Sequence, residues 1–281
     1  MTNPTIVVLT TIFVWWFSTG AILWRVRHAD RLGHEAHLLS VFFALPLLIA
    51  GFYGLHVSLD DTSVTGAYVA FLSALSVWGW FEVAFLSGVI TGPNTQPCPP
   101  FTAMWERFLR ATGTILWHEL ALILTLVAIS LVAWGAVNEY GLWTFVILFF
   151  ARISAKLNLF FGVPRIHTEF LPRPLSHLAS HFRHATMNWV FPVSITALSF
   201  AIACWLERAI SAETEAGVVG YMLLSTLTAL ALLEHWFMVV PLPDQKLWRW
   251  MLPEAVPKAR KSRSSPATAG KTADAVPTAR N

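Results

Sequence analysis

Long apolar runs separated by short polar stretches dominate the chain. Seven of these runs approach or exceed the ~20 residues that an α-helix needs to cross the ~30 Å hydrocarbon core of a bilayer. Backbone groups inside lipid must be bonded within their own segment, so spans of this kind are helical. The pattern predicts an all-α, multi-pass membrane protein with about seven transmembrane helices. The expected spans are residues 6–24, 39–58, 67–92, 115–137, 142–163, 189–206 and 217–240.

The composition agrees with this prediction. Of the 281 residues, 56% are hydrophobic and only 12% are charged, whereas a soluble domain has about 25% charged residues. The first apolar run has neither a basic residue before it nor a small-residue cleavage site after it, so we expect an uncleaved span. Cys98 and Cys204 are expected near opposite membrane faces, which excludes a disulfide between them. The sequence contains no nucleic-acid-binding motif and no phosphate-binding loop.

Basic residues alternate between the two sides of the predicted bundle. The loops after the first, third and fifth spans carry arginines, and the chain after the seventh span is rich in lysine and arginine. The loops after the second, fourth and sixth spans are acidic or carry no basic excess. Because basic loops stay on the cytoplasmic side, we expect the N-terminus outside and the C-terminus in the cytoplasm.

Residues 1–252 are expected to form the seven-helix domain. Within it, residues 100–114 place aromatic and aliphatic side chains at helical spacing, which predicts an interfacial amphipathic helix. The run Lys246–Leu252 is expected to anchor in the same interface. Residues 253–281 are rich in Ala, Pro, Ser, Thr and Lys, which predicts a disordered basic tail. Its expected partner is anionic lipid of the bilayer.

Glu82 lies inside the third expected span, where an unpaired charge is costly. Arg152 and Lys156 are four residues apart in the fifth span and share one helical face. We therefore expect Glu82 to form a structural intramembrane charge pair with one of these two cations.

Histidines and glutamates from several spans and one loop are expected at one depth, near the cytoplasmic face. Imidazole and carboxylate groups suit iron or zinc, and a neutral imidazole also suits the Mg of a chlorin. An ordinary interfacial histidine, bonded to a neighbouring carbonyl, is the alternative. The candidate cofactor ligands His118 and His235 are expected to face inward, each oriented by a carboxylate from another element. The candidate metal ligands are His118, Glu119, His167, Glu169, Glu234 and His235.

The loop at residues 164–188 is rich in histidine and broken by prolines. His177, His181 and His184 are spaced i, i+4, i+7 and would share one face of an α-helix. This spacing occurs in HxxxH metal sites. Leu178 and its apolar neighbours, however, fall on the opposite face, which favours an arrangement with the three histidines pointing to the cytosol.

Six short segments follow one another along the chain: HEL at 118–120, NLFFG at 158–162, TEFLP at 168–172, MNWVFPVS at 187–194, EHWFMVVPLPD at 234–244 and LWRW at 247–250. Their order resembles the PuhE-type photosynthetic complex assembly proteins, which are integral membrane proteins of anoxygenic phototrophic bacteria. The resemblance covers roughly residues 5–252. It implies a location in the bacterial inner membrane, cytoplasmic or intracytoplasmic, and association with the reaction centre and its antenna. It supplies no catalytic residue and no cofactor.

Two functional interpretations stay open. The first is a non-enzymatic assembly factor that binds photosynthetic complex subunits or pigment-synthesis proteins and handles bacteriochlorophyll, a precursor or their supply. The alternative is a membrane metalloenzyme whose cytoplasmic-face His/Glu site acts on a pigment, an isoprenoid or a lipid. A haem protein with His118 and His235 as axial ligands ranks behind both. The metal and pigment content of the purified protein discriminates between them.

Overall fold

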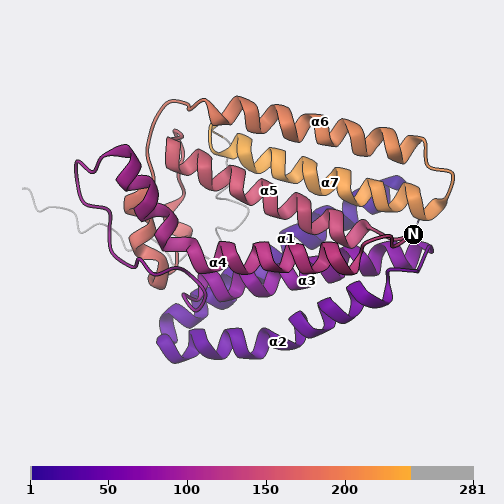
Figure 1. Cartoon of the computed structure of the whole chain (residues 1–281), viewed down its shortest axis with the longest axis horizontal. Helices are drawn as coiled ribbons and strands as arrows, with labels where there is room; N and C mark the ends of the chain where they lie inside the picture. The colour runs from indigo at the N-terminus through magenta and orange to yellow at the C-terminus, as the bar shows by residue number, and fades with distance from the viewer. Residues whose placement is uncertain (1, 242–281) are drawn as a thin grey trace, which may run out of the picture. The chain divides into compact units, whose positions relative to one another are not determined.

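The computed structural model of the protein describes residues 2–241. Within this range seven α-helices are long and apolar enough to span a membrane, which confirms the predicted multi-pass, all-α class. The expected anchor at Lys246–Leu252 and the expected tail at residues 253–281 lie outside the described residues. The helices in Figure 1 are α1 (Pro4–Leu32), α2 (His34–Val57), α3 (Val64–Leu86), α4 (Met104–Val132), α5 (Tyr140–Phe161), α6 (Val190–Ile210) and α7 (Glu215–Phe237).

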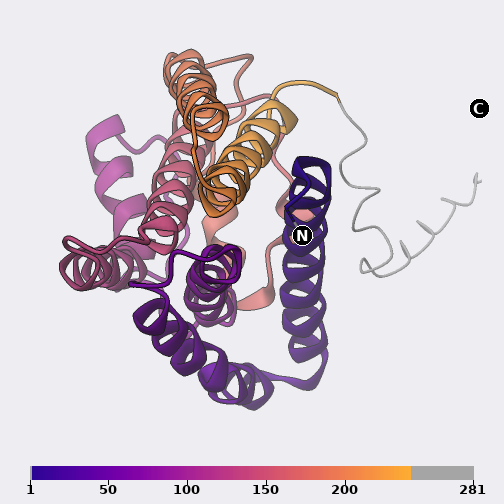
Figure 2. The ribbon, with the colours of Figure 1, turned by 90° about the vertical axis from the view of Figure 1, so that its right-hand side faces the viewer.

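The seven helices run side by side and alternate in direction, as Figures 1 and 2 show. Helices α3 and α7 form the centre of the bundle: more than half of the apolar window of each is buried, against a third or less for the other five. Helix α5 packs against both of them, α2 covers α3, α6 covers α7, and α1 packs along α7, α2 and α3. The outer faces of the peripheral helices are rich in exposed apolar side chains, as lipid contact requires.

Helix α1 is longer than the apolar pattern predicts. It continues past residue 24 to Leu32 and ends at Gly33, whose φ of 105° suits glycine far better than other residues. Asp30, in this last turn, is buried and accepts hydrogen bonds from the ring of His37 at 3.1 Å and from the backbone N–H of Arg173 at 3.1 Å. The polar residues after the first apolar run therefore continue a helix that holds the 164–188 loop in place.

Residues 104–114 are helical, as predicted, but they are not a separate helix. They form the first turns of α4, which leave the line of the rest of that helix in Figure 1. The preceding segment diverts two backbone groups at the bend: His118 N–H donates to Thr91 C=O, and Gly113 C=O accepts from Asn94 N–H, both at 3.0 Å. These groups would otherwise serve the α-helical ladder, so their diversion accounts for the bend.

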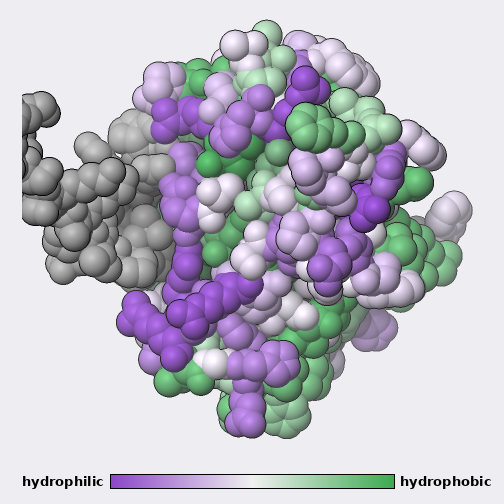
Figure 3. Space-filling view, turned by 90° about the vertical axis from the view of Figure 1, so that its left-hand side faces the viewer, coloured by the Kyte–Doolittle hydropathy of each residue, from purple (hydrophilic) through white to green (hydrophobic). Residues whose placement is uncertain are grey.

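The histidine-rich loop contains two 3₁₀ helices, η1 (Thr168–Phe170) and η2 (Arg173–His181). A 3₁₀ helix has three residues per turn, so Leu175, Leu178 and His181 share its buried face. The leucines pack against Phe85 at the end of α3. The expected common face of His177, His181 and His184 is therefore not formed: His181 is buried, whereas His184 is exposed. Figure 3 looks onto this end of the bundle, where hydrophilic residues gather.

The buried His181 predicts a pH-dependent stability. Burial lowers the pKa of His181 below its ordinary value of 6.5, so the folded protein holds this ring neutral. The unfolded chain binds the proton first as the pH falls, so we expect the free energy of unfolding to decrease below about pH 6.5. His181→Gln should flatten this decrease in thermal unfolding scans, and His184→Gln, at an exposed position, should not. If the unfolding temperature of His181→Gln depends on pH as strongly as that of the original protein, His181 is not the source of the pH dependence.

Candidate functional site

A cavity of about 470 Å³ lies inside the bundle between α1, α3, α5 and α7. Its volume is within the range of small-molecule binding sites, which is roughly 300–1,000 Å³. Most of its wall is apolar. The apolar lining includes Phe71, Leu75 and Trp78 of α3, Ile147 and Leu148 of α5, and Leu227 and Leu230 of α7.

One end of the cavity is polar, and it lies towards η1 and η2; we call this the η end. Glu82 is about one turn from the C-terminal end of α3, and Glu234 is about one turn from the C-terminal end of α7. Arg152 of α5 joins them in the lining, and His167 and Phe170 cover them from the loop. The cavity is therefore amphipathic, with its charged groups at one end.

Glu82 and Arg152 form an ion pair across α3 and α5. The distance from Arg152 Nη2 to Glu82 Oε2 is 2.8 Å, so Glu82 contacts one of its two expected partners. The second, Lys156, instead forms an ion pair with Glu119 of α4. Because Arg152 and Lys156 are one turn apart on α5, each cation serves a carboxylate from a different neighbouring helix.

Glu234 has a different environment. The indole Nε1 of Trp15 on α1 donates a hydrogen bond to Glu234 Oε1 at 2.9 Å. Within residues 2–241 no lysine, arginine or histidine lies within ion-pair distance of Glu234, although Arg152 influences it electrostatically. More than a third of the surface of Glu234 is accessible although it lies deep in the bundle, because the carboxylate faces the cavity.

The two candidate cofactor histidines face the bundle interior but lie outside the cavity lining. His235 Nδ1 is 2.8 Å from Ala231 C=O and Nε2 is 2.8 Å from Ser154 Oγ. A carbonyl can only accept, so in the neutral ring Nδ1 carries the proton. His118 is fully buried, and its ring packs against Phe85 with 4.5 Å between centroids.

The carboxylate partners expected for these two histidines are not present. His235 is oriented by a serine and a carbonyl, and neither ring nitrogen of His118 has a hydrogen-bond partner in the described residues. Glu169 lies instead 3.2 Å from Nδ1 of His167, its near neighbour in the loop. Glu82 and Glu119 are paired with cations, and Glu234 is bonded to an indole. These carboxylates are therefore not available to orient a histidine.

The six candidate metal ligands are also not brought together. In the part of the chain that the structure describes, no group of three or more His, Cys, Asp or Glu side chains could hold a metal ion. Glu119 is engaged by Lys156, and Glu234 is bonded to Trp15. The donor set therefore does not fit the iron or zinc site expected from the sequence.

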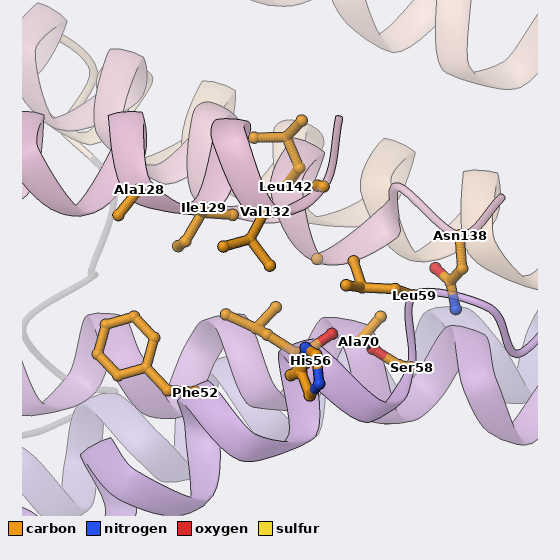
Figure 4. A pocket seen from close by; sticks show the side chains of 13 residues that line it. Phe52, His56, Ser58, Leu59, Ala70, Ala128, Ile129, Val132, Asn138 and Leu142 are labelled. Carbon is orange, nitrogen blue, oxygen red and sulfur yellow. Dashed lines mark hydrogen bonds between the residues drawn. The ribbon is translucent and has the colours of Figure 1, made fainter. Parts of the chain in front are cut away.

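A second cavity, of about 250 Å³, lies between α2 and α4 at the opposite end of the bundle (Figure 4). Its walls include Phe52 of α2 and Val132 of α4. His56 and Asn138 are the more polar residues of a lining that contains no carboxylate, lysine or arginine among the described residues. Without charged groups to orient a ligand, it is a weaker candidate than the larger cavity.

Sequence reasoning missed the contribution of α1 to the larger cavity. Thr11, Trp15, Ser18 and Ile22 all line it. Their spacing of i, i+4, i+7, i+11 places them on one helical face. The available signal was a pair of hydroxyl-bearing residues and a tryptophan on one face of an apolar span. The sequence could not show that Glu234 lies opposite that face, because this depends on tertiary packing.

Comparison with known proteins identifies relatives along almost the whole chain. An uncharacterized 30.4 kDa protein in the puhA 5′ region of Rhodobacter capsulatus is 66% identical over 253 residues, which cover 90% of this chain and 92% of that protein. No solved structure matches the chain. The model of the DUF3623 family, described as a protein of unknown function, matches residues 1–259. This protein therefore belongs to the DUF3623 family.

Proposed function

We propose that this protein is an assembly factor for photosynthetic complexes in the bacterial inner membrane, where its larger cavity handles a hydrophobic molecule that those complexes need. The amphipathic cavity carries the proposal, because a seven-helix bundle needs no internal space for stability and packed interiors leave few voids. The photosynthetic context is supported by the resemblance to the PuhE-type proteins and by the relative in the puhA 5′ region of Rhodobacter capsulatus. Bacteriochlorophyll or a precursor is the candidate molecule.

The cavity favours binding and transfer over metal-dependent catalysis. Its apolar wall suits a flat or chain-like hydrophobic molecule, and its few polar groups suit orientation of one end. The candidate metal ligands are dispersed, which removes the main support for a metalloenzyme. In this proposal the η end faces the cytoplasm, where subunits of the complexes or pigment-synthesis proteins would be the partners, and the basic C-terminal tail would contact anionic lipid.

A cavity-filling substitution tests the proposal in a phototrophic host. Leu227→Trp adds a bulky ring at a cavity-lining position of α7, so we expect reaction-centre and antenna absorbance to fall at least several-fold. Leu233→Trp, six residues later on the same helix but exposed on its outer side, is the matched control and should retain normal absorbance. Immunoblots of membranes must show equal amounts of both variants. Normal absorbance in Leu227→Trp cells would contradict a role for the cavity.

A further inference from the structure

The unbalanced charge at the η end of the cavity indicates what kind of molecule it binds. Two carboxylates, Glu82 and Glu234, line this end together with one cation, Arg152. The neighbouring pair of Glu119 and Lys156 lies outside the lining and adds one charge of each sign. When all five groups are ionised, one negative charge has no cation in contact. The carboxylate left over is Glu234, because Glu82 and Glu119 form the ion pairs, whereas within residues 2–241 the bonded partner of Glu234 is a neutral indole.

The geometry leaves Glu234 able to bind a ligand. Trp15 occupies one of its oxygens, Oε1, and the side chain is accessible from the cavity. Holding a carboxylate inside the bundle without a contacting cation is costly, so a ligand that donates a hydrogen bond or brings a positive charge would be favoured here. An acidic head group would instead add a second uncompensated negative charge beside the carboxylates of Glu82 and Glu234. The guanidinium of Arg152 is already engaged by Glu82 and lies in the field of the other carboxylates.

The length of the cavity indicates the rest of the ligand. Along α3 the lining runs from Phe71 past Glu82 to Leu86, and the part between Phe71 and Glu82 measures about 16 Å at the rise of an α-helix. This is close to half of the ~30 Å hydrocarbon thickness, so the distance from the charged end to Phe71 is about one leaflet. Its charged end lies near the ends of α3 and α7, and its apolar end lies towards the middle of the spans. A lipid-like molecule has this same layout within one leaflet.

We propose that the cavity binds a single-chain amphiphile with a hydroxyl or amine head group, with the head at Glu234 and the chain directed towards Phe71. The inference rests on the proposed binding role of the cavity but not on the photosynthetic context. Glu234 is the residue that selects the head group, and Trp15 is a positioning residue that holds its carboxylate. Prenyl chains and acyl chains share the required chemistry.

The test uses the full-length protein in lipid nanodiscs and three photoreactive probes: hexadecanol, hexadecylamine and hexadecanoic acid, each with a diazirine at the far end of the chain. Cross-linked peptides are mapped by mass spectrometry. We expect saturable labelling of the Phe71 and Leu75 region by the alcohol and the amine, and labelling at least tenfold weaker by the acid. A parallel competition with unlabelled geranylgeraniol and hexadecanol distinguishes a prenyl from an acyl source.

Variants assign the binding to named residues. Glu234→Gln should reduce labelling by the amine at least tenfold, because the neutral amide no longer balances its charge. The matched control is Glu139→Gln, which alters another tryptophan–glutamate bond, that of Trp143 Nε1 to Glu139 Oε2 at 3.1 Å, away from the cavity. Leu227→Trp should abolish labelling by all three probes, and Leu233→Trp should leave it unchanged. Unchanged thermal unfolding in Glu234→Gln shows that the variant is folded.

Labelling confined to outer helix faces, equal labelling by the acid and the amine, or labelling insensitive to Glu234→Gln would overturn the proposal. Binding of bacteriochlorophyll without binding of any of the three probes would overturn this inference and leave the proposed function standing. Binding of the probes together with normal photosynthetic complexes in Leu227→Trp cells would support the inference and refute the proposed function.

Discussion

Replacing Arg152 with glutamine is expected to lower the free energy of unfolding by about 3 kcal/mol or more, because it removes one partner of an ion pair within the bundle. Among the described residues, Glu82 would lose its one contacting cation, and Lys156 would be left as the cation beside Glu82 and Glu119. The result should appear as a lower yield of inserted protein and a lower unfolding temperature in detergent. Glu82→Gln alone should have a comparable effect, since it leaves the guanidinium without its carboxylate.

The double variant Glu82→Gln/Arg152→Gln decides whether the pair itself is responsible. Two neutral amides can bond to each other, so the double variant should recover most of the stability that either single variant loses. The matched control is the exposed pair of Glu106 and Arg110, separated by 2.8 Å near the start of α4. Breaking this pair by Glu106→Gln should cost less than about 1 kcal/mol, because water screens both groups. A double variant no more stable than either single one would remove the case for coupling.

The number and type of spanning helices were predictable from the sequence because the property that decides them is local. An apolar run of about 20 residues specifies a membrane-spanning helix whatever its neighbours are. The candidates for the intramembrane pair could also be found, because an ionisable residue in a span needs a partner. The sequence could not show which of the two cations, Arg152 or Lys156, pairs with Glu82. Both lie on one face of α5, and the choice depends on where α3 and α4 pack.

The candidate site was predicted less well, because its composition depends on how the helices pack against one another. His118 and His235 face inward, as expected, but the cavity lies on another side of α5 and α7 and draws its polar groups from Glu234, Arg152 and the α1 face of Trp15. The composition of the histidine-rich loop suggested three histidines on one α-helical face. Its conformation is set by prolines and 3₁₀ geometry, so a period of 3.6 residues could not describe its buried face.

The bend in α4 is the feature least visible in the sequence, and it depends on Gly92. This residue lies against the backbone of α4 where Thr91 and Asn94 divert hydrogen bonds from the helix. A Cβ at position 92 would lie 2.7 Å from the carbonyl carbon of Thr114 and 2.8 Å from the backbone nitrogen of Ile115, and it would also overlap the carbonyl oxygen of Gly113. All three neighbours are backbone atoms, so no side-chain rotation can relieve the contact.

Gly92→Ala is therefore expected to destabilise the protein by roughly 2–3 kcal/mol, at the upper end of the cost of overpacking a close contact. The connecting segment must move away from α4, which breaks the bond from His118 N–H to Thr91 C=O and exposes the helix at its bend. Faster hydrogen exchange at the amides of residues 114–118 and a lower unfolding temperature would be measured together.

The matched control is Gly79→Ala in α3, where a Cβ meets nothing closer than a methyl group of Ile22 at 3.8 Å. Alanine favours a helix over glycine by up to about 1 kcal/mol, so this variant should be as stable as the original or more so. If Gly92→Ala and Gly79→Ala unfold at the same temperature, the close approach at Gly92 does not hold α4 in its bent form.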